Sequence, residues 1–479
     1  MKPLLKLLVV LGALLIVSVP AFAQGSPPSL TGNWIGSLNA NGMILHLVWH
    51  FTPKPDGTLT ATFDSPDQGA MGLPFSTAKV TRQAVHLEAA GIGGSFDGTL
   101  DAAGKTLTGQ WKQGGASLPL TLTRTSQTTT APALNRPQEP RPPFPYTSAD
   151  VTFPGGASGV TLAGTLTTPP GAGPFPAVVL IAGSGRVDRD ETAFGHKIFL
   201  LLADTLTRRG IAVLRYDKRG IGHSTGSYAL ATSLDFAADA EAAVTYLRTQ
   251  AKIAPKKIGL LGHSEGGLIA PLIASQHPSQ IAFVVLLAGP GETGEKVLLA
   301  QSALIAKADG ASAVQIAQDA ALQKTLFRIA EKETDPSVVQ AEAQAAVLKA
   351  ITILSPADKA QISNPTMYAK AQSRAVASPW MRFFLTYDPR SALETTRCPV
   401  LALAGSKDLQ VPPTENLAGI KQALKAGGNP SVTVKELPNL NHLFQTCAAG
   451  SPSEYAKISE TMAPVVLTTI GDWIVAHSR

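Results

Sequence analysis

The chain contains little cysteine and little charge for its length. Only Cys398 and Cys447 occur among 479 residues, which excludes a disulfide-rich scaffold and a zinc site built from cysteines. Charged residues make up 15% of the chain without a long block of one sign, which excludes a coiled coil or a charged disordered tail. The formal net charge of +6 is thinly spread, so we expect no nucleic-acid partner. With 44% hydrophobic residues, the chain is globular and long enough for about two or three domains.

The amino-terminal segment has the three parts of a secretory signal. A basic start with Lys2 is followed by an apolar run over residues 7–19 and by Ala21-Phe22-Ala23. The run is shorter than the ~20 apolar residues of a spanning helix, and Ala-x-Ala is typical of a cleavage site. No cysteine follows that point, so we expect no lipid or other stable membrane anchor. We predict a signal peptide over residues 1–23 and a bacterial periplasmic or secreted protein; an uncleaved anchor is the alternative.

Residues 24–126 are predicted to form a small antiparallel β-barrel domain. The segment is rich in Gly and Thr, has short runs of alternating polarity, and shows no useful helical period. In residues 45–51, leucine and aromatic side chains share one face, while His46 and His50 lie on the other. These two histidines lack an obvious third ligand, so we expect no metal site. The role of the domain, binding an apolar ligand or only packing on its neighbour, is left open.

Residues 127–146 form a predicted proline-rich linker. Six prolines lie between Ser126 and Tyr146, and they favour an extended, semi-rigid connector that continues neither strand nor helix. The linker separates the β domain from a second domain over residues 147–479.

In the second domain, apolar runs alternate with amphipathic helical segments. After a predicted hairpin over residues 151–168, six runs are typical of buried parallel strands: 177–182, 211–214, 258–261, 283–287, 400–403 and 432–434. This alternation predicts a doubly wound α/β domain. About 110 residues separate the fourth and fifth runs, more than a crossover needs, and their helical spacing predicts an inserted helical lid over residues 292–388.

Two Gly-x-Ser-x-Gly patterns are candidates for a serine nucleophile. Such a serine needs a sharp turn between a strand and a helix, where its hydroxyl is exposed. Ser224 is separated from the preceding strand by several polar residues and does not meet this condition. The pattern around Ser264, residues 262–266, directly follows the strand ending at Leu261 and precedes an apolar helix, whose amino terminus lends positive potential. We therefore predict Ser264 as the nucleophile.

The acid and the base are expected to follow the serine in that order. Asp408 comes just past the carboxyl end of the strand at 400–404, where catalytic groups gather in such folds. Asp388, the alternative, precedes that strand in a Tyr-Asp-Pro turn. His442 is the only histidine after Asp408 apart from His477 near the terminus, and we predict it as the general base.

Two backbone amides are predicted to form the oxyanion hole. One is the N–H of Glu265, the residue after the nucleophile, and the other lies in the loop after the first central strand, where we choose Ser184. The charged residues 188–190 of that loop are interpreted as a bracing ion network, with substrate contact as the alternative. Asp217 and Arg219 are interpreted as a structural pair.

Both cysteines are expected to remain free thiols. Cys398 would lie at the amino end of its strand and Cys447 at the carboxyl end of the sheet. At about 3.3 Å per residue, this separation exceeds the ~7 Å within which a disulfide can form.

These motifs together resemble the α/β-hydrolase superfamily. Within it the chain resembles bacterial serine esterases with a Gly-His-Ser-Glu-Gly-Gly elbow, here residues 262–267, and residues 183–190, 215–220 and 440–442 are similar to that group as well. The resemblance covers residues 151–479. It implies a carboxylesterase-type serine hydrolase that forms an acyl-enzyme on Ser264, uses no cofactor or metal, and takes a small-molecule ester, with short-chain acyl esters expected. The usual His-Gly start of the oxyanion loop is Ala182-Gly183 here, and residues 24–126 resemble lipocalin-like domains.

Other functions are compatible with the same residues. A serine peptidase of the prolyl oligopeptidase type resembles the second domain, but its usual large propeller has no counterpart in the roughly 100 residues before the linker. A thioesterase is a further alternative, and a non-catalytic envelope-binding protein would require an idle set of catalytic residues. The natural ester and the oligomeric state are left open.

Overall fold

The computed structural model describes residues 29–40, 43–54, 58–65, 70–113, 116–126, 135–360, 362 and 364–478. The predicted signal peptide and residues 127–134 of the predicted linker lie outside the described residues. No helix within these ranges is long and apolar enough to cross a membrane.

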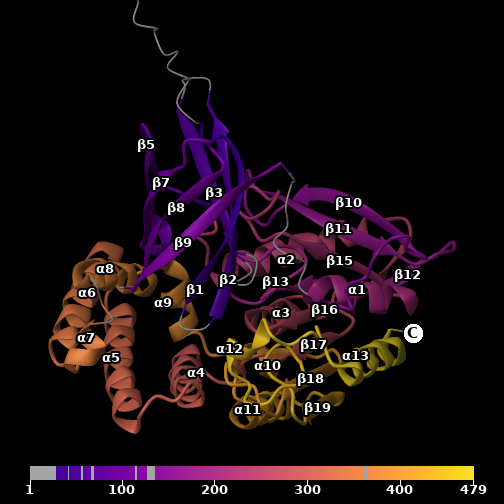
Figure 1. Ribbon diagram of the computed structural model, residues 1–479. Helices are drawn as coiled ribbons and strands as arrows, with labels where there is room; N and C mark the ends of the chain where they lie inside the picture. The colour runs from indigo at the N-terminus through magenta and orange to yellow at the C-terminus, as the bar shows by residue number, and fades with distance from the viewer. Residues whose placement is uncertain are drawn as a thin grey trace, which may run out of the picture.

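The first domain is a curled antiparallel sheet (Figure 1). Its described strands are β1 (Gly32–Ala40), β2 (Met43–Pro53), β3 (Leu59–Ser65), β4 (Ala70–Pro74), β5 (Thr77–Thr81), β6 (Ala84–Ala89), β7 (Gly94–Leu100), β8 (Thr106–Gln113) and β9 (Ala116–Thr125). Sequential strands pair, β9 returns to β1, and the outermost strands β4 and β5 follow one another in the chain. At their junction, Phe75 N donates to Ala61 O at 2.9 Å and Ser76 N to Glu88 O at 2.6 Å. These bonds bring the two edges of the sheet together, as in a barrel.

Alternate side chains of these strands fill the inside of the curled sheet. Trp34, Trp49 and Phe96 are fully buried there. The ring centroid of Trp49 lies 5.0 Å from those of Phe75 and Phe96, in edge-to-face geometry. The period-2 pattern of the sequence therefore places its apolar face inward, and aromatic rings occupy the centre of the domain.

The second domain is built on a mixed sheet. In the described chain its strand order is β10-β11-β15-β12-β16-β17-β18-β19, and β11 runs antiparallel to both neighbours while the strands from β15 onward are parallel. The strands are β10 (Thr147–Pro154), β11 (Thr161–Thr168), β12 (Phe175–Ile181), β15 (Ala212–Tyr216), β16 (Ile253–His263), β17 (Val284–Leu287), β18 (Val400–Gly405) and β19 (Val432–Leu437). A small hairpin of β13 (Thr192–Ala193) and β14 (His196–Lys197) follows β12.

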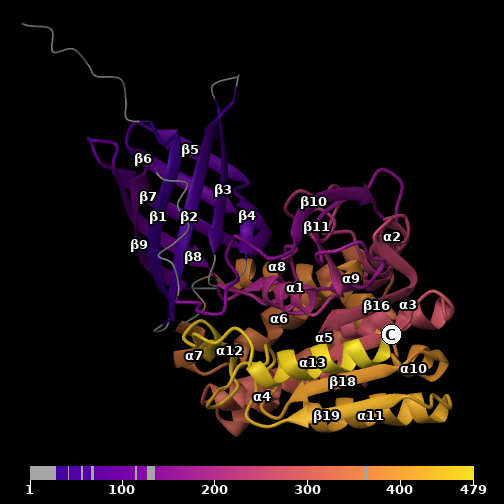
Figure 2. The same ribbon diagram turned by 90° about the vertical axis from the view of Figure 1, so that its right-hand side faces the viewer.

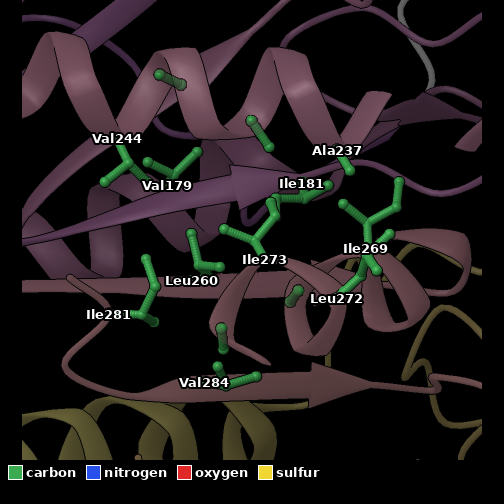
Figure 3. Close-up of a cluster of buried hydrophobic side chains, with 14 of the residues drawn as sticks. Val179, Ile181, Ala237, Val244, Leu260, Ile269, Leu272, Ile273, Ile281 and Val284 are labelled. Carbon is green, nitrogen blue, oxygen red and sulfur yellow. The ribbon is translucent and has the colours of Figure 1, made fainter. Parts of the chain in front are cut away.

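Helices cover both faces of this sheet. They are α1 (Ile198–Arg208), α2 (Ser233–Arg248), α3 (Glu265–Gln276), α10 (Arg390–Thr395), α11 (Pro413–Ala426) and α13 (Pro464–His477), with the short α12 (Pro452–Tyr455) beside them. One face packs on α2, α3, α10 and α11, and the other on α1 and α13. In Figure 3, Val179 and Leu260 of the sheet meet Val244 of α2 and Ile273 of α3. Both faces are apolar, which explains why the strands read as continuous hydrophobic runs.

The long insertion between β17 and β18 is helical. It contains α4 (Gly294–Ala308), α5 (Ala313–Lys332), α6 (Pro336–Thr352), α7 (Pro356–Ala360), α8 (Pro365–Val376) and α9 (Pro379–Thr386). All of these except α7 contribute side chains to a small apolar core. Of these helices, the orange α8 lies next to the β domain in both views (Figures 1 and 2). Arg374 Nη1 of α8 donates to Ala90 O of the β domain at 3.1 Å. The predicted fold class, an all-β domain before an α/β domain with a helical lid, is confirmed.

Candidate active site

Ser264 occupies the turn between β16 and α3. Its backbone has φ 52° and ψ −118°, a conformation that a residue with a side chain rarely adopts. The turn is closed so tightly that a Cβ on Gly262 would lie 1.9 Å from Gly266 O, and one on Gly266 would lie 2.0 Å from Ile181 O. Glycine is therefore required at both positions, and the turn lifts the serine out of the end of the sheet.

Asp408 and His442 come together from the ends of two neighbouring strands. Asp408 follows β18, His442 follows β19, and His442 Nδ1 lies 2.8 Å from Asp408 Oδ2 with both side chains buried. Asp408 Oδ1 accepts hydrogen bonds from the backbone amides of Gln410 and Val411, at 2.8 and 2.9 Å. The carboxylate is thus fixed by two amides and orients the imidazole of His442 through Nδ1. The other ring nitrogen, Nε2, takes no part in this contact.

A single cavity of about 220 Å³ is lined by Ser264, His442 and the loop after β12, including Ser184. The loop passes close over the nucleophile, because a Cβ on Gly183 would lie 3.1 Å from Ser264 Cβ. Asp388, the alternative acid, instead forms an ion pair with Arg390 next to it. The structure therefore brings the predicted nucleophile, base and acid to one place and leaves Asp388 elsewhere.

The peptide between Gly183 and Ser184 is held in one orientation. Gly183 N donates to Glu191 Oε1 at 2.7 Å, and Gly183 O accepts from Lys218 Nζ at 2.6 Å. In a trans peptide the N–H of Ser184 points opposite to that carbonyl. Within the described part of the chain, neither this N–H nor that of Glu265 donates to another protein group. Both predicted oxyanion donors are thus without a protein acceptor, and Ser184 lines the cavity.

His263 and Glu191 form a buried pair that the sequence reasoning missed. His263 Nδ1 lies 2.9 Å from Glu191 Oε1, and His263 Nε2 lies 3.1 Å from His442 O. Burial alone would lower the pKa of His263, but the carboxylate of Glu191 raises it above its usual value. The pair joins the oxyanion loop, the elbow and the segment of His442. The sequence pattern that could have indicated this pair is His263, at the first variable position of the Gly-x-Ser-x-Gly elbow, together with the acidic Glu191 in the oxyanion loop.

A second buried network connects the elbow to the lid. Glu265 Oε2 lies 3.1 Å from Lys218 Nζ, and Glu265 Oε1 accepts from Ser233 Oγ and from Trp380 Nε1, both at 2.6 Å. Trp380 belongs to α9 and stacks on Phe384. The side chain of Glu265, the residue after the nucleophile, therefore connects the elbow to the lid.

Comparison with known proteins agrees with this geometry. Residues 196–446, which include Ser264, Asp408 and His442, match the hydrolase family described as serine aminopeptidase, S33. A curated relative, Esterase EstD of Thermotoga maritima, is 30% identical over 334 residues, covering 70% of this chain and 68% of that protein. The chain belongs to this family. This confirms the prediction that the chain is a carboxylesterase-type hydrolase of the α/β-hydrolase superfamily.

Solved structures of low identity also match this S33-family hydrolase. Est1E from Butyrivibrio proteoclasticus, solved with ferulic acid, is 15% identical with a TM-score of 0.40, covering 68% of this chain and 98% of that one. A thermophilic esterase from Thermogutta terrifontis is 18% identical with a TM-score of 0.38, covering 69% of this chain and 100% of that one.

The charged residues around the site brace loops, but one predicted pairing is wrong. Asp217 does not pair with Arg219: it binds Arg189 Nη2 at 2.8 Å, whereas Arg219 Nε binds Asp239 at 2.7 Å. Burial would raise the pKa of Asp217, but hydrogen bonds from Arg189 and from the amide of His223 hold it below its usual range. Although Asp217 and Arg219 are only two residues apart, their side chains point in different directions after β15. Each therefore pairs with a residue on a different, more distant segment.

The remaining sequence candidates have local structural contacts. Ser224 Oγ donates to Asp217 O at 2.7 Å and is buried, as expected of a structural serine. His50 lies between Asn33 and Asp64, at 2.9 and 2.8 Å. Among the described residues, no group of three His, Cys, Asp or Glu side chains could hold a metal ion. Cys398 and Cys447 are both free thiols.

Proposed function

We propose that the protein hydrolyses carboxylic esters of small molecules through an acyl-enzyme on Ser264. The observation that carries the proposal is the hydrogen-bonded pair of Asp408 and His442 on the same cavity as a serine in a strained elbow. This set of residues has the parts needed for nucleophilic catalysis: a nucleophile, a base, and a carboxylate that orients the base. The family and the esterase named among its relatives support the same chemistry.

In the proposed reaction His442 moves one proton in each half. Its Nε2 takes the proton of the Ser264 hydroxyl while the serine oxygen bonds to the ester carbon, and it returns this proton to the departing alcohol as the carbon–oxygen bond breaks. Water then attacks the acyl carbon and gives a proton to His442. His442 returns this proton to the Ser264 oxygen as its bond to the acyl carbon breaks, which releases the acid and restores the free serine. The amides of Ser184 and Glu265 donate to the oxyanion of each tetrahedral intermediate.

We propose short acyl chains because the cavity is small. Its volume of about 220 Å³ is below the ~300 Å³ at which drug-sized ligand sites begin. The aminopeptidase activity in the family description is the second candidate. Binding a free amino terminus needs an accessible carboxylate. Among the described lining residues the only acid is Glu191, whose Oε1 is bound to His263 and to Gly183 N and whose Oε2 is buried. An ester substrate therefore agrees better with the lining.

The test is hydrolysis of p-nitrophenyl esters of increasing acyl length by the wild type and by Ser264→Ala. A proline-linked peptide amide and a thioester of the same acyl group are measured alongside. We expect turnover of the short-chain esters that is lost in Ser264→Ala. Cleavage of the amide without the esters would instead support the peptidase, and preferred cleavage of the thioester would support a thioesterase.

We also propose the periplasm or the exterior of a bacterial cell as the location. The proposal rests on the signal-like residues 1–23, which lie outside the described residues. Mass spectrometry of the amino terminus of the exported protein tests it: a chain that begins at residue 24 is expected, and an intact residue 1 would contradict it.

A further inference from the structure

The loop after β12 contains one cation without a partner. Its other charged residues are all engaged: Asp188 with Thr192, Arg189 with Asp217, Asp190 with Arg215 and Glu191 with His263. For Arg186, the described residues provide neither a hydrogen bond nor an ion pair. Its guanidinium lies over the ring of Tyr228, with 5.6 Å from the guanidinium carbon to the ring centroid. Asp188 is held by the amide and hydroxyl of Thr192 and not by a cation, whereas Arg186 is exposed and its guanidinium is free to bind an external anion.

Arg186 lines the same cavity as Ser264 and His442. The side chains of Val187, Phe194 and Leu443 give the cavity apolar walls. Glu191 is the only acidic residue among the described residues that line the cavity. Its Oε1 is already bound to His263 and to Gly183 N. Arg186 therefore places a positive charge on the lining of the cavity that also contains Ser264, and no carboxylate among the described lining residues forms an ion pair with it.

The position of the guanidinium is restrained by aromatic packing. Tyr228 stacks on Phe236 of α2, with ring centroids 5.7 Å apart, so the ring beneath Arg186 is itself fixed. A guanidinium held near an aromatic face by a cation–π contact still has N–H groups that can bind the two oxygens of a carboxylate. A neutral ester would leave these donors to water.

We propose that Arg186 binds a carboxylate carried by the substrate, so that the preferred esters are small and anionic. This inference rests on the proposed ester hydrolysis and adds the class of substrate. The carboxylate could belong to the acyl part, as in a half-ester of a dicarboxylic acid, or to the alcohol part. The shared chemistry is a carboxylate within reach of the oxyanion loop.

Two matched pairs of esters test the proposal and separate these sources. In the acyl pair, p-nitrophenyl hemiglutarate is compared with p-nitrophenyl valerate, which has the same number of acyl carbons. In the alcohol pair, the butyrate ester of 4-hydroxybenzoate is compared with that of 4-hydroxybenzamide. We expect the wild type to favour the charged member of one pair by about tenfold in kcat/KM, as for a charge-assisted hydrogen bond.

Variants assign the preference to Arg186. In Arg186→Gln the charged-to-neutral ratio of kcat/KM should fall about tenfold, and Arg186→Lys should retain part of it. Arg141→Gln is the matched control, because Arg141 is exposed and lies outside the cavity lining; it changes the net charge equally and should leave the ratio unchanged. A wild-type ratio near one, or a ratio that Arg186→Gln does not alter, overturns the inference. Absence of turnover with all four esters would instead contradict the proposed ester hydrolysis.

Discussion

At the scale of single residues, the function depends on which acid orients His442. Asp408 is buried, accepts two backbone amides and binds His442 Nδ1, whereas Asp388 is paired with Arg390 near the surface. Asp408→Asn should lower kcat on a short-chain ester by a factor on the order of 10³ to 10⁴, because an amide can stabilise the wrong tautomer of the imidazole. Steady-state kinetics measure this loss.

Asp388→Asn provides the comparison for that measurement. The same chemical change at the rejected position should leave kcat within about twofold, since an exposed ion pair contributes little. A large loss in Asp388→Asn together with a small one in Asp408→Asn would reverse the assignment.

His196 gives a second prediction at this scale, on stability against pH. It is fully buried, with Nδ1 near Thr461 Oγ1 and Nε2 near Tyr455 O, both at 3.1 Å. Burial, and then the charge of Arg136, lowers the pKa of His196 to about 4. Between pH 6.5 and about pH 4 the unfolded chain therefore binds a proton that the folded chain does not.

The free energy of unfolding should consequently fall by about 3 kcal/mol as the pH is lowered through this window. Denaturant unfolding at pH 7, 5.5 and 4 in wild type and in His196→Gln measures the effect. His196→Gln lowers stability at pH 7 but should show a shallower dependence on pH. His223→Gln, an exposed histidine, should keep the wild-type slope, and an unchanged slope in His196→Gln would contradict the prediction.

At the scale of elements, the lid is fixed to the catalytic turn through α9. Trp380 Nε1 donates to Glu265 Oε1 at 2.6 Å, and Glu265 also binds Lys218 and Ser233. Trp380→Phe keeps an aromatic ring against Phe384 but removes this donor. We expect a loss of about 1.5 to 3 kcal/mol of stability, and faster hydrogen exchange within α9, measured by mass spectrometry.

Tyr387→Phe is the matched control for this helix. The hydroxyl of Tyr387 is buried and has no hydrogen-bond partner in the described structure, so its removal breaks no bond. Its stability and the exchange rate of α9 should stay near those of the wild type. Equal effects of the two variants would show that ring packing, not the bond to Glu265, holds the lid.

The sequence predicted elements and site residues whose positions are set by local order along the chain. Asp408 and His442 each follow a strand, and parallel strands bring such residues to one edge of the sheet. Glu191 and Trp380 could not be found in this way, because their partners lie 72 and 115 residues away and depend on how a loop and a helix pack. The same limit explains the wrong pairing of Asp217 with Arg219. The prediction assumed that residues close in sequence are in contact, whereas the conformation of the loops determines which side chains meet.

At the scale of the whole molecule, the linker is part of the catalytic domain's structure. Arg136 is buried and, besides the carbonyl of its neighbour Asn135, donates to four backbone carbonyls of the catalytic domain at 2.9 to 3.3 Å: those of Phe194, Gly195, Ala456 and Ile458. Phe194 lines the active-site cavity, so the linker supports one of its walls. By contrast, the contact of the β domain with the lid at Arg374 and Ala90 is exposed.

Two truncated chains separate these contributions. A chain of residues 135–479 retains Arg136 and should keep short-chain ester hydrolysis with a Tm near that of the full chain. A chain of residues 147–479 leaves the four carbonyls without their donor, and we expect it to lose at least about 3 kcal/mol of stability, since each buried unsatisfied group costs about 1–3 kcal/mol. Calorimetry and ester kinetics on both chains make the comparison. If the two behave alike, the linker only connects the domains; if residues 135–479 are as unstable as residues 147–479, the β domain itself stabilises the hydrolase.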